Sequence, residues 1–90
     1  MHTPDVIDQS PEVLMGQVGD VVSEVIGKTI SDSEANLIAL GLDSLTLLEI
    51  LATLEEKFGI ILNEGVIEEF QTIARITRVV EDAVRAFAAE

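Results

Sequence analysis

One serine, Ser44, is the residue of this sequence best placed to do chemistry. It lies in the run Leu40-Gly41-Leu42-Asp43-Ser44-Leu45, directly before a strongly apolar stretch. Glycine adopts positive φ without steric strain, so Gly41 can turn the chain sharply into a helix. Asp43 supplies a carboxylate that can accept hydrogen bonds from the free N–H groups of a first helical turn. The pattern therefore predicts a helix over about residues 44–58 that carries Ser44 on its first turn.

Ser44 lacks the sequence partners that would make it a catalytic nucleophile. The only histidine is His2, near the N-terminus, and the chain has no cysteine and no glycine-rich phosphate loop. The acidic run Ser31-Asp32-Ser33-Glu34 lacks the ligand spacing of a helix-loop-helix calcium site. We therefore expect no catalytic residue and no metal site. The chain is expected to be a substrate of enzymes and not an enzyme.

The run from Leu40 to Leu45 resembles the modification site of the acyl carrier protein superfamily, which includes acyl, peptidyl and aryl carriers. In that family the serine of an Asp-Ser-Leu segment, preceded by a Leu-Gly-X turn, carries a phosphopantetheine arm. The resemblance implies that 4′-phosphopantetheine from coenzyme A is attached covalently at Ser44, with Asp43 and Leu45 as flanking recognition residues. The thiol of the arm then holds an acyl or aminoacyl group as a thioester. An Asp-Ser pair is also a common helix cap, so Ser44 could serve only as part of a cap.

The same resemblance implies the partners. They are a phosphopantetheinyl transferase, an acyl- or aminoacyl-loading enzyme, and ketosynthase, acyltransferase or condensation-type enzymes. Leu42 and Thr46-Leu47-Leu48 look more like carriers of polyketide and related specialised metabolism than like the fatty-acid carrier. The Gly-Leu-Asp-Ser run also resembles aryl carriers, while peptidyl carriers tend to have a second glycine in place of Leu42. Nonribosomal peptide and fatty-acid carriers stay open as alternatives, as does an unmodified acidic interaction module.

The elements that must position Ser44 are predicted to form an all-α, four-helix bundle of three longer helices and one short helix. Ser10-Pro11-Glu12 is a helix-start signature, and the first helix should run to about Ile26. A long loop over residues 28–42 follows, with a short turn near 34–39. Its apolar residues are expected to hold it over the bundle: Ile30, Leu37, Ile38 and Leu40.

Two further helices are expected after Gly59, which should end the helix that begins at Ser44. Ile60-Ile61-Leu62 is expected to anchor the connection that follows Gly59. A short segment should begin at Asn63 or Glu64 and run to about Phe70, with Gly65 disturbing its regularity. Thr72 should cap the last helix, whose apolar residues recur at helical spacing: Ile73, Ile76, Val80, Val84 and Phe87.

The helix over residues 44–58 is too apolar for one buried stripe. Its expected core residues are Leu47, Ile50, Leu51, Leu54 and Phe58. Leu45, Leu48 and Ala52 form an adjoining stripe, interleaved with acidic residues, namely Glu49, Glu55 and Glu56. Either the helix is buried on two sides, or these residues form an exposed docking face with an acidic rim. We expect the docking face.

The composition sets the frame for these expectations. The chain has 90 residues, of which 48% are hydrophobic and 3% aromatic, which favours one domain of small packed helices. We expect a leader without regular structure at residues 1–9 and a carrier domain at 10–88. Seventeen acidic against five basic residues give a net charge of −12, which argues against nucleic acid as a partner. We expect a cytoplasmic protein without a membrane partner, since no signal sequence or membrane-spanning run is present. We also expect a monomer, either as a discrete protein or as a domain cut from a longer one.

Overall fold

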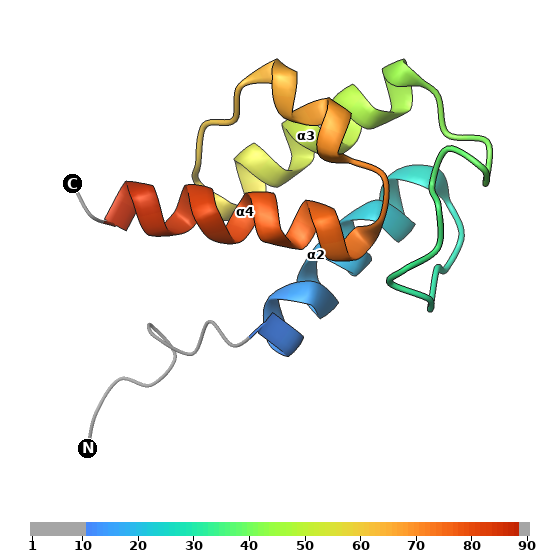
Figure 1. Cartoon of the computed structure of the whole chain (residues 1–90), viewed down its shortest axis with the longest axis horizontal. Coiled ribbons are helices and arrows are strands. Elements are labelled where there is room, and N and C mark those ends of the chain that lie inside the picture. The colour runs from blue at the N-terminus through green and yellow to red at the C-terminus, as the bar shows by residue number, and fades with distance from the viewer. Residues whose placement is uncertain (1–10, 89–90) are drawn as a thin grey trace.

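The computed structural model describes residues 11–88. Within them lie four helices and no strand: α2 (Pro11–Ile26), α3 (Ser44–Phe58), the short 3-10 helix η1 (Glu64–Glu69) and α4 (Ile73–Ala88) (Figure 1). The predicted all-α bundle of three longer helices and one short helix, with a long loop between the first two longer helices, is confirmed. The leader expected at residues 1–9 and the cap expected at Ser10 lie outside the described residues.

The helix ends follow from local residue chemistry. Asp43 is the N-cap of α3, and Gly59 ends that helix in the left-handed region with φ of 64°. Asn63 caps η1, where its side chain accepts a hydrogen bond from the Gly65 N–H at 2.7 Å. The Thr72 hydroxyl accepts a hydrogen bond from the Arg75 N–H at 3.1 Å, as expected of the cap of α4.

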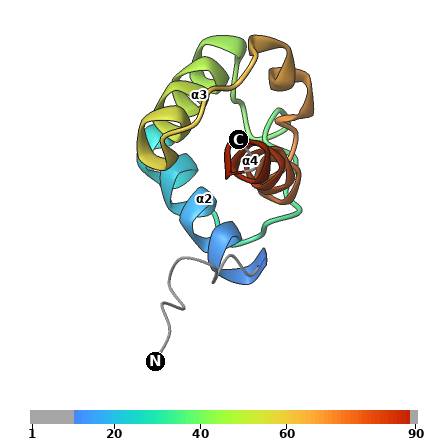
Figure 2. The same ribbon diagram turned by 90° about the vertical axis from the view of Figure 1, so that its left-hand side faces the viewer.

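The core lies where α2, α3 and α4 meet, and Figure 2 shows α2, α3 and η1 arranged around α4. The predicted apolar stripes supply most of the fully buried side chains. Phe70, which follows η1, is buried as completely as any of them. The largest fully buried side chains are those of Leu14, Val18, Val22, Leu37, Ile50, Leu54, Phe70, Ile76 and Val80. Ile60 and Leu62 are buried as expected of a connection that anchors the chain, whereas Ile61 between them is exposed.

The long loop between α2 and α3 is fastened to the bundle by backbone hydrogen bonds. The Ile30 N–H donates to the Ser23 hydroxyl, the Leu37 N–H to the Gln71 carbonyl, and the Ala74 N–H to the Ser33 carbonyl. These bonds satisfy backbone groups that a free loop would leave to water. The loop is therefore a defined part of the fold.

One expectation for this loop was wrong. Leu37 is fully buried, but Ile38 and Leu40 are 52% and 41% exposed, and do not pin the loop to the core. The chain makes a tight turn here, with hydrogen bonds from Leu40 N–H to the Leu37 carbonyl and from Gly41 N–H to the Ile38 carbonyl. A tight turn presents only one side to the core, so Leu37 and Leu42 are buried and the residues between them point outward.

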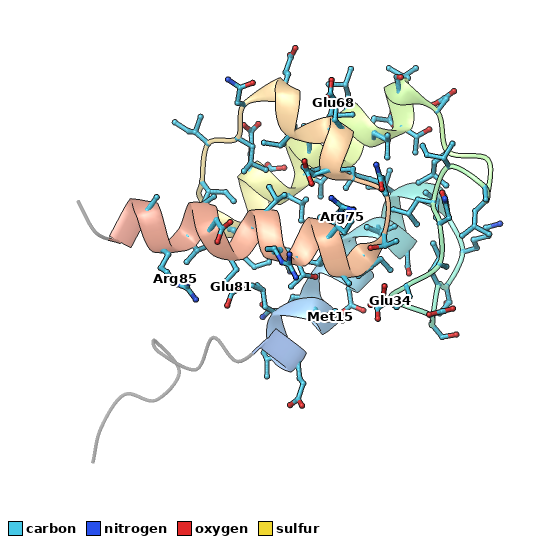
Figure 3. All side chains as sticks on the ribbon, viewed as in Figure 1. Met15, Glu34, Glu68, Arg75, Glu81 and Arg85 are labelled. Atoms are coloured by element: carbon cyan, nitrogen blue, oxygen red, sulfur yellow. The ribbon has the colours of Figure 1, made fainter. Side chains whose placement is uncertain are left out.

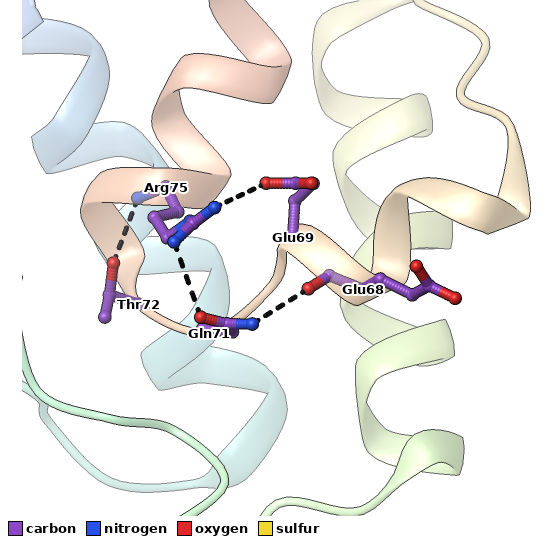
Figure 4. Close-up of polar contacts among 5 residues, drawn as sticks. All are labelled: Glu68, Glu69, Gln71, Thr72 and Arg75. Atoms are coloured by element: carbon purple, nitrogen blue, oxygen red, sulfur yellow. Dashed lines mark hydrogen bonds and ion pairs between the residues drawn. The ribbon is translucent and has the colours of Figure 1, made fainter.

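The junction between η1 and α4 is held by a small polar network. Figure 3 labels its arginine, Arg75, together with the pair Glu81 and Arg85 farther along α4. Arg75 pairs with Glu69 at 2.8 Å and donates a hydrogen bond to the Gln71 side-chain oxygen at 3.5 Å (Figure 4). Both partners of the Arg75–Glu69 ion pair are half exposed, so the pair contributes little stability and mainly orients the turn.

Candidate functional site

Ser44 is the first residue of α3, and its side chain is exposed. Gly41 has φ of 99°, a left-handed conformation that glycine alone adopts without strain, and this turn brings the chain into the helix. Leu42 is 7% exposed and anchors the chain between the turn and the serine. The predicted placement of a serine hydroxyl at the start of α3 is thus observed.

Asp43 holds the first turn of α3 through one carboxylate oxygen. Oδ1 accepts hydrogen bonds from the Thr46 N–H and from the Thr46 hydroxyl, each at 2.9 Å. The backbone hydrogen bond from Thr46, followed by the one from its hydroxyl, lowers the pKa of Asp43 from its ordinary value of 3.8. Asp43 is therefore a carboxylate at neutral pH. The sequence did not indicate the part that the Thr46 hydroxyl takes in this cap.

The backbone at the start of α3 has unpaired hydrogen-bond donors. Within residues 11–88, the N–H groups of Ser44 and Leu45 make no hydrogen bond. Free N–H groups at a helix N-terminus, together with the helix dipole, favour a bound anion such as a phosphodiester. The Asp43 carboxylate opposes such an anion by like charge. The geometry around Ser44 therefore fits a phosphate group, while the observed role of Asp43 is to cap the helix.

α3 is buried on one side only. Leu47, Ile50, Leu51 and Leu54 face the core, whereas Leu45 is 67% exposed and Leu48 is 36% exposed. Ala52 is also exposed, so the alternative that α3 is buried on two sides does not hold. Ile38 and Leu40, in the turn before Ser44, are further exposed apolar side chains. Sequence reasoning missed them because nothing in their types distinguishes them from the buried Leu37 and Leu42.

The three glutamates predicted for the docking face have different surroundings. Glu49 and Glu56 are exposed. Glu55 is half buried, and its Oε2 accepts a hydrogen bond from the Leu62 N–H at 2.9 Å. Glu55 thus ties α3 to the connection that leads into η1, whereas the Glu49 and Glu56 side chains are exposed to solvent.

Two features that other classes of protein would need are not found in the part of the chain that the structure describes. No described helix is both long and apolar enough to cross a membrane. Across residues 11–88, the histidine, cysteine, aspartate and glutamate side chains form no group of three or more that could hold a metal ion. The acidic run around Asp32 instead makes local turns, in which the Glu34 N–H donates to Asp32 Oδ1 at 2.9 Å.

Comparison with known protein families identifies the class of protein. The chain matches the phosphopantetheine attachment site family over residues 16–80. The chain belongs to this family, and with it to the acyl carrier protein superfamily. It is therefore a carrier protein, and its cofactor is covalently attached 4′-phosphopantetheine.

Solved structures show the same fold. An acyl carrier protein from Thermotoga maritima superposes with a TM-score of 0.72 at 19% identity, covering 86% of this chain and 93% of that chain. A chain in the structure of the ishigamide ketosynthase/chain length factor superposes with a TM-score of 0.70 at 20% identity, covering 79% of this chain and 93% of that chain. At these identities the likeness concerns the fold alone. No curated protein matches the chain significantly in sequence.

Proposed function

We propose that Ser44 is the residue that carries the phosphopantetheine arm, within a carrier domain that spans residues 10–88. The observation that carries this proposal is an exposed serine hydroxyl on the first turn of α3, beside free N–H groups and inside the region that matches the family. In the transfer, the Ser44 oxygen forms a bond to the β-phosphorus of coenzyme A and the pyrophosphate bond breaks. The adenosine bisphosphate leaves, and the serine proton passes to the transferase or to solvent.

The chain itself supplies the hydroxyl, its orientation and a surface for partner enzymes. The arm, once attached, supplies a thiol that holds an acyl or aminoacyl group as a thioester. Because the chain has no cysteine, it offers no competing thiol. Because the cargo is tethered, its delivery between active sites depends on the effective concentration that the arm sets. The protein is a non-catalytic carrier in this proposal.

The proposed docking face is the exposed side of α3 around Ser44. Its apolar part consists of Leu45, Leu48 and Ala52, and its acidic part of Glu49, Glu56 and the half-buried Glu55. An exposed apolar patch with charged edges is the composition of a transient interface. The net charge of −12 favours partners with a basic surface, because complementary charge speeds encounter. Phosphopantetheinyl transferases, loading enzymes, and ketosynthase, acyltransferase or condensation-type enzymes are the proposed partners.

We place the carrier in polyketide or related specialised metabolism. Leu42 and Thr46-Leu47-Leu48 around the motif support this assignment, and so does the fold shared with a chain in the ishigamide ketosynthase/chain length factor structure. Peptidyl or aryl carriers of nonribosomal peptide synthesis and fatty-acid carriers are the alternatives. Loading assays with malonyl, aminoacyl, aryl and fatty acyl donors distinguish them, since a cognate loading enzyme accepts one class of cargo.

Intact-protein mass spectrometry tests the attachment site. The unmodified protein is incubated with coenzyme A, magnesium and a broad-specificity phosphopantetheinyl transferase, with Ser44→Ala treated in parallel. We expect the wild type to gain the mass of one phosphopantetheine and the variant to gain none. A folded wild type that gains nothing, while a known carrier is modified beside it, would instead favour an unmodified acidic module that binds partners through Leu45, Leu48 and Ala52.

A further inference from the structure

A groove lies where α2, the first part of the long loop and the start of α4 meet. Its volume is about 440 Å³, which lies within the range of about 300–1,000 Å³ for small-ligand sites. The residues that line it come from the Glu12–Ser23 part of α2, from loop residues 29–33, and from Ile73 of α4. None of these lining residues belongs to α3. The groove is therefore separate from the proposed docking face around Ser44.

The floor of the groove is apolar and open because two helix positions carry no side chain. Met15 on α2 (Figure 3) and Ile73 on α4 contribute the floor, and Gly16 and Gly19 lie beside them on α2. A Cβ at Gly16 would meet nothing within 4 Å, and one at Gly19 would meet only Ile73, at 3.9 and 4.0 Å. Neither glycine has positive φ. Neither backbone strain nor packing within the chain thus requires glycine here, although glycine weakens a helix interior relative to alanine.

The rim of the groove is acidic. The Glu12 and Asp20 side chains line it and are exposed. Among residues 11–88, no basic side chain lines the groove, and neither carboxylate forms an ion pair or a hydrogen bond. The remaining polar groups at its edge are the hydroxyls of Ser23, Thr29, Ser31 and Ser33. The apolar floor and the unpaired carboxylates together complement a side chain that has an aliphatic stem and a positively charged end.

The groove is also formed in advance. Its loop wall is held at one end by the hydrogen bond from Ile30 N–H to the Ser23 hydroxyl, at 3.1 Å. At the other end it is held by the bond from Ala74 N–H to the Ser33 carbonyl, at 3.0 Å. A binding group therefore meets a surface that needs little further ordering, which removes one of the entropic costs of association.

We propose that this groove is a second docking site, which takes an arginine side chain from a partner protein. The aliphatic stem of the arginine lies on Met15 and Ile73, and the guanidinium pairs with Glu12 or Asp20. Guanidinium groups bind carboxylates with two hydrogen bonds, and arginine is enriched at the centres of interfaces. A second copy of the chain fits less well, because two copies that each carry a net charge of −12 repel one another.

Amide chemical shifts of the isotopically labelled, unmodified full chain test the proposal at low ionic strength. The probe is the blocked tripeptide acetyl-Leu-Arg-Leu-amide, and acetyl-Leu-Glu-Leu-amide is its control. We expect shift changes with the arginine probe to centre on Gly16, Gly19, Ile30 and Ile73. Because no modification is involved, the result does not depend on whether Ser44 carries an arm.

Variants of α2 give the test its specificity. Gly16→Leu fills the groove and should abolish the shift changes at Ile30 and Ile73. Gln17→Leu adds the same side chain one residue further along, outside the groove, and should leave them intact. The double variant Glu12→Gln and Asp20→Asn should weaken binding about fivefold, as expected for the loss of an exposed ion pair. The dispersion of the amide spectrum shows whether each variant is folded.

Four results would overturn the proposal. The first is the absence of shift changes at the highest soluble concentration of the arginine probe. The second is a pattern spread evenly over all acidic residues, including Glu49 and Glu56 of α3, which indicates unspecific attraction. The third is equal binding of the arginine and glutamate probes, and the fourth is binding that Gly16→Leu leaves unchanged.

Discussion

At the residue scale, Asp43 and Ser44 are neighbours with different tasks. Asp43 uses Oδ1 for both hydrogen bonds from Thr46, and within residues 11–88 its Oδ2 makes no hydrogen bond or ion pair. The same carboxylate can therefore cap α3 and present a free oxygen to a basic partner. Ser44 contributes only its exposed hydroxyl, so its replacement should leave the fold unaffected. Substitutions at Asp43 can separate the cap from the charge.

Asp43→Ala should lower the melting temperature by a few degrees, because it removes the N-cap of α3. Asp43→Asn should retain most of the stability at neutral pH, since asparagine caps helices about as well as aspartate. If Asp43 also pairs with a basic partner, the asparagine variant should be modified more slowly despite its intact fold. Thermal unfolding and the initial rate of phosphopantetheine transfer measure the two effects separately.

The stability difference between wild type and Asp43→Asn should also depend on pH. Hydrogen bonds to the ionised carboxylate lower the pKa of Asp43 in the folded chain below its ordinary value of 3.8. The contribution of the charge is then fully present above that value and is lost as the pH falls through the lowered pKa. Urea unfolding of both proteins from neutral to acid pH measures this difference. A difference that grows on acidification would contradict the assigned role of the carboxylate.

At the element scale, α3 divides its surface between the core, the solvent and the connection to η1. Its 3.6-residue period places Leu47, Ile50 and Leu54 on the buried side and Leu45 on the exposed side. Glu55 lies between these sides, where its carboxylate accepts the Leu62 N–H. The two neighbouring glutamates of α3, Glu55 and Glu56, are therefore not equivalent.

Glu55→Ala should destabilise the fold by about 1–2 kcal/mol, because it leaves the part-buried Leu62 N–H without its acceptor. Glu56→Ala is the matched control and should change the stability by less than about 0.5 kcal/mol, since its side chain is exposed. Urea unfolding of the two variants compares them directly. Equal losses of stability in the two variants would mean that the hydrogen bond from Leu62 to Glu55 does not stabilise the fold.

At the scale of the whole molecule, the long loop is anchored in the core by Leu37 and Leu42. Leu37 is fully buried, and its N–H donates to the Gln71 carbonyl at the start of the turn into α4. Gly41 and Leu42 then lead directly to Ser44. Leu37 thus joins the turn that leads to Ser44 to the segment that leads into α4.

Leu37→Ala should lower the free energy of unfolding by about 2–5 kcal/mol, as expected when a fully buried leucine is truncated. Ile38→Ala is its neighbour and control, and should cost less than about 1 kcal/mol because Ile38 is 52% exposed. Thermal or urea unfolding measures both. Similar losses of stability in the two variants would show that the loop does not pack as described.

The sequence alone predicted the elements because their signals are local. Helix periodicity, the Asp43 cap, the Gly59 stop and the Thr72 cap depend on residues within a few positions of each other, and the structure confirms each of them. The irregularity expected near Gly65 appears as a 3-10 helix, and Ser44 lies at the predicted helix start. The sequence run around Ser44 was also enough to suggest the family to which the chain belongs.

Only the tertiary structure decided which apolar residues of the long loop face inward. Leu37, Ile38, Leu40 and Leu42 are chemically alike, and their burial depends on a turn whose hydrogen bonds reach residues far along the chain, such as Gln71. The same holds for Glu55, whose acceptor role requires Leu62 to lie beside it, and for the groove between Gly16, Ile30 and Ile73. Periodicity reports the face of a helix on which a residue lies. The groups that pack against that face come from distant parts of the chain, so their contacts are settled only when the chain folds.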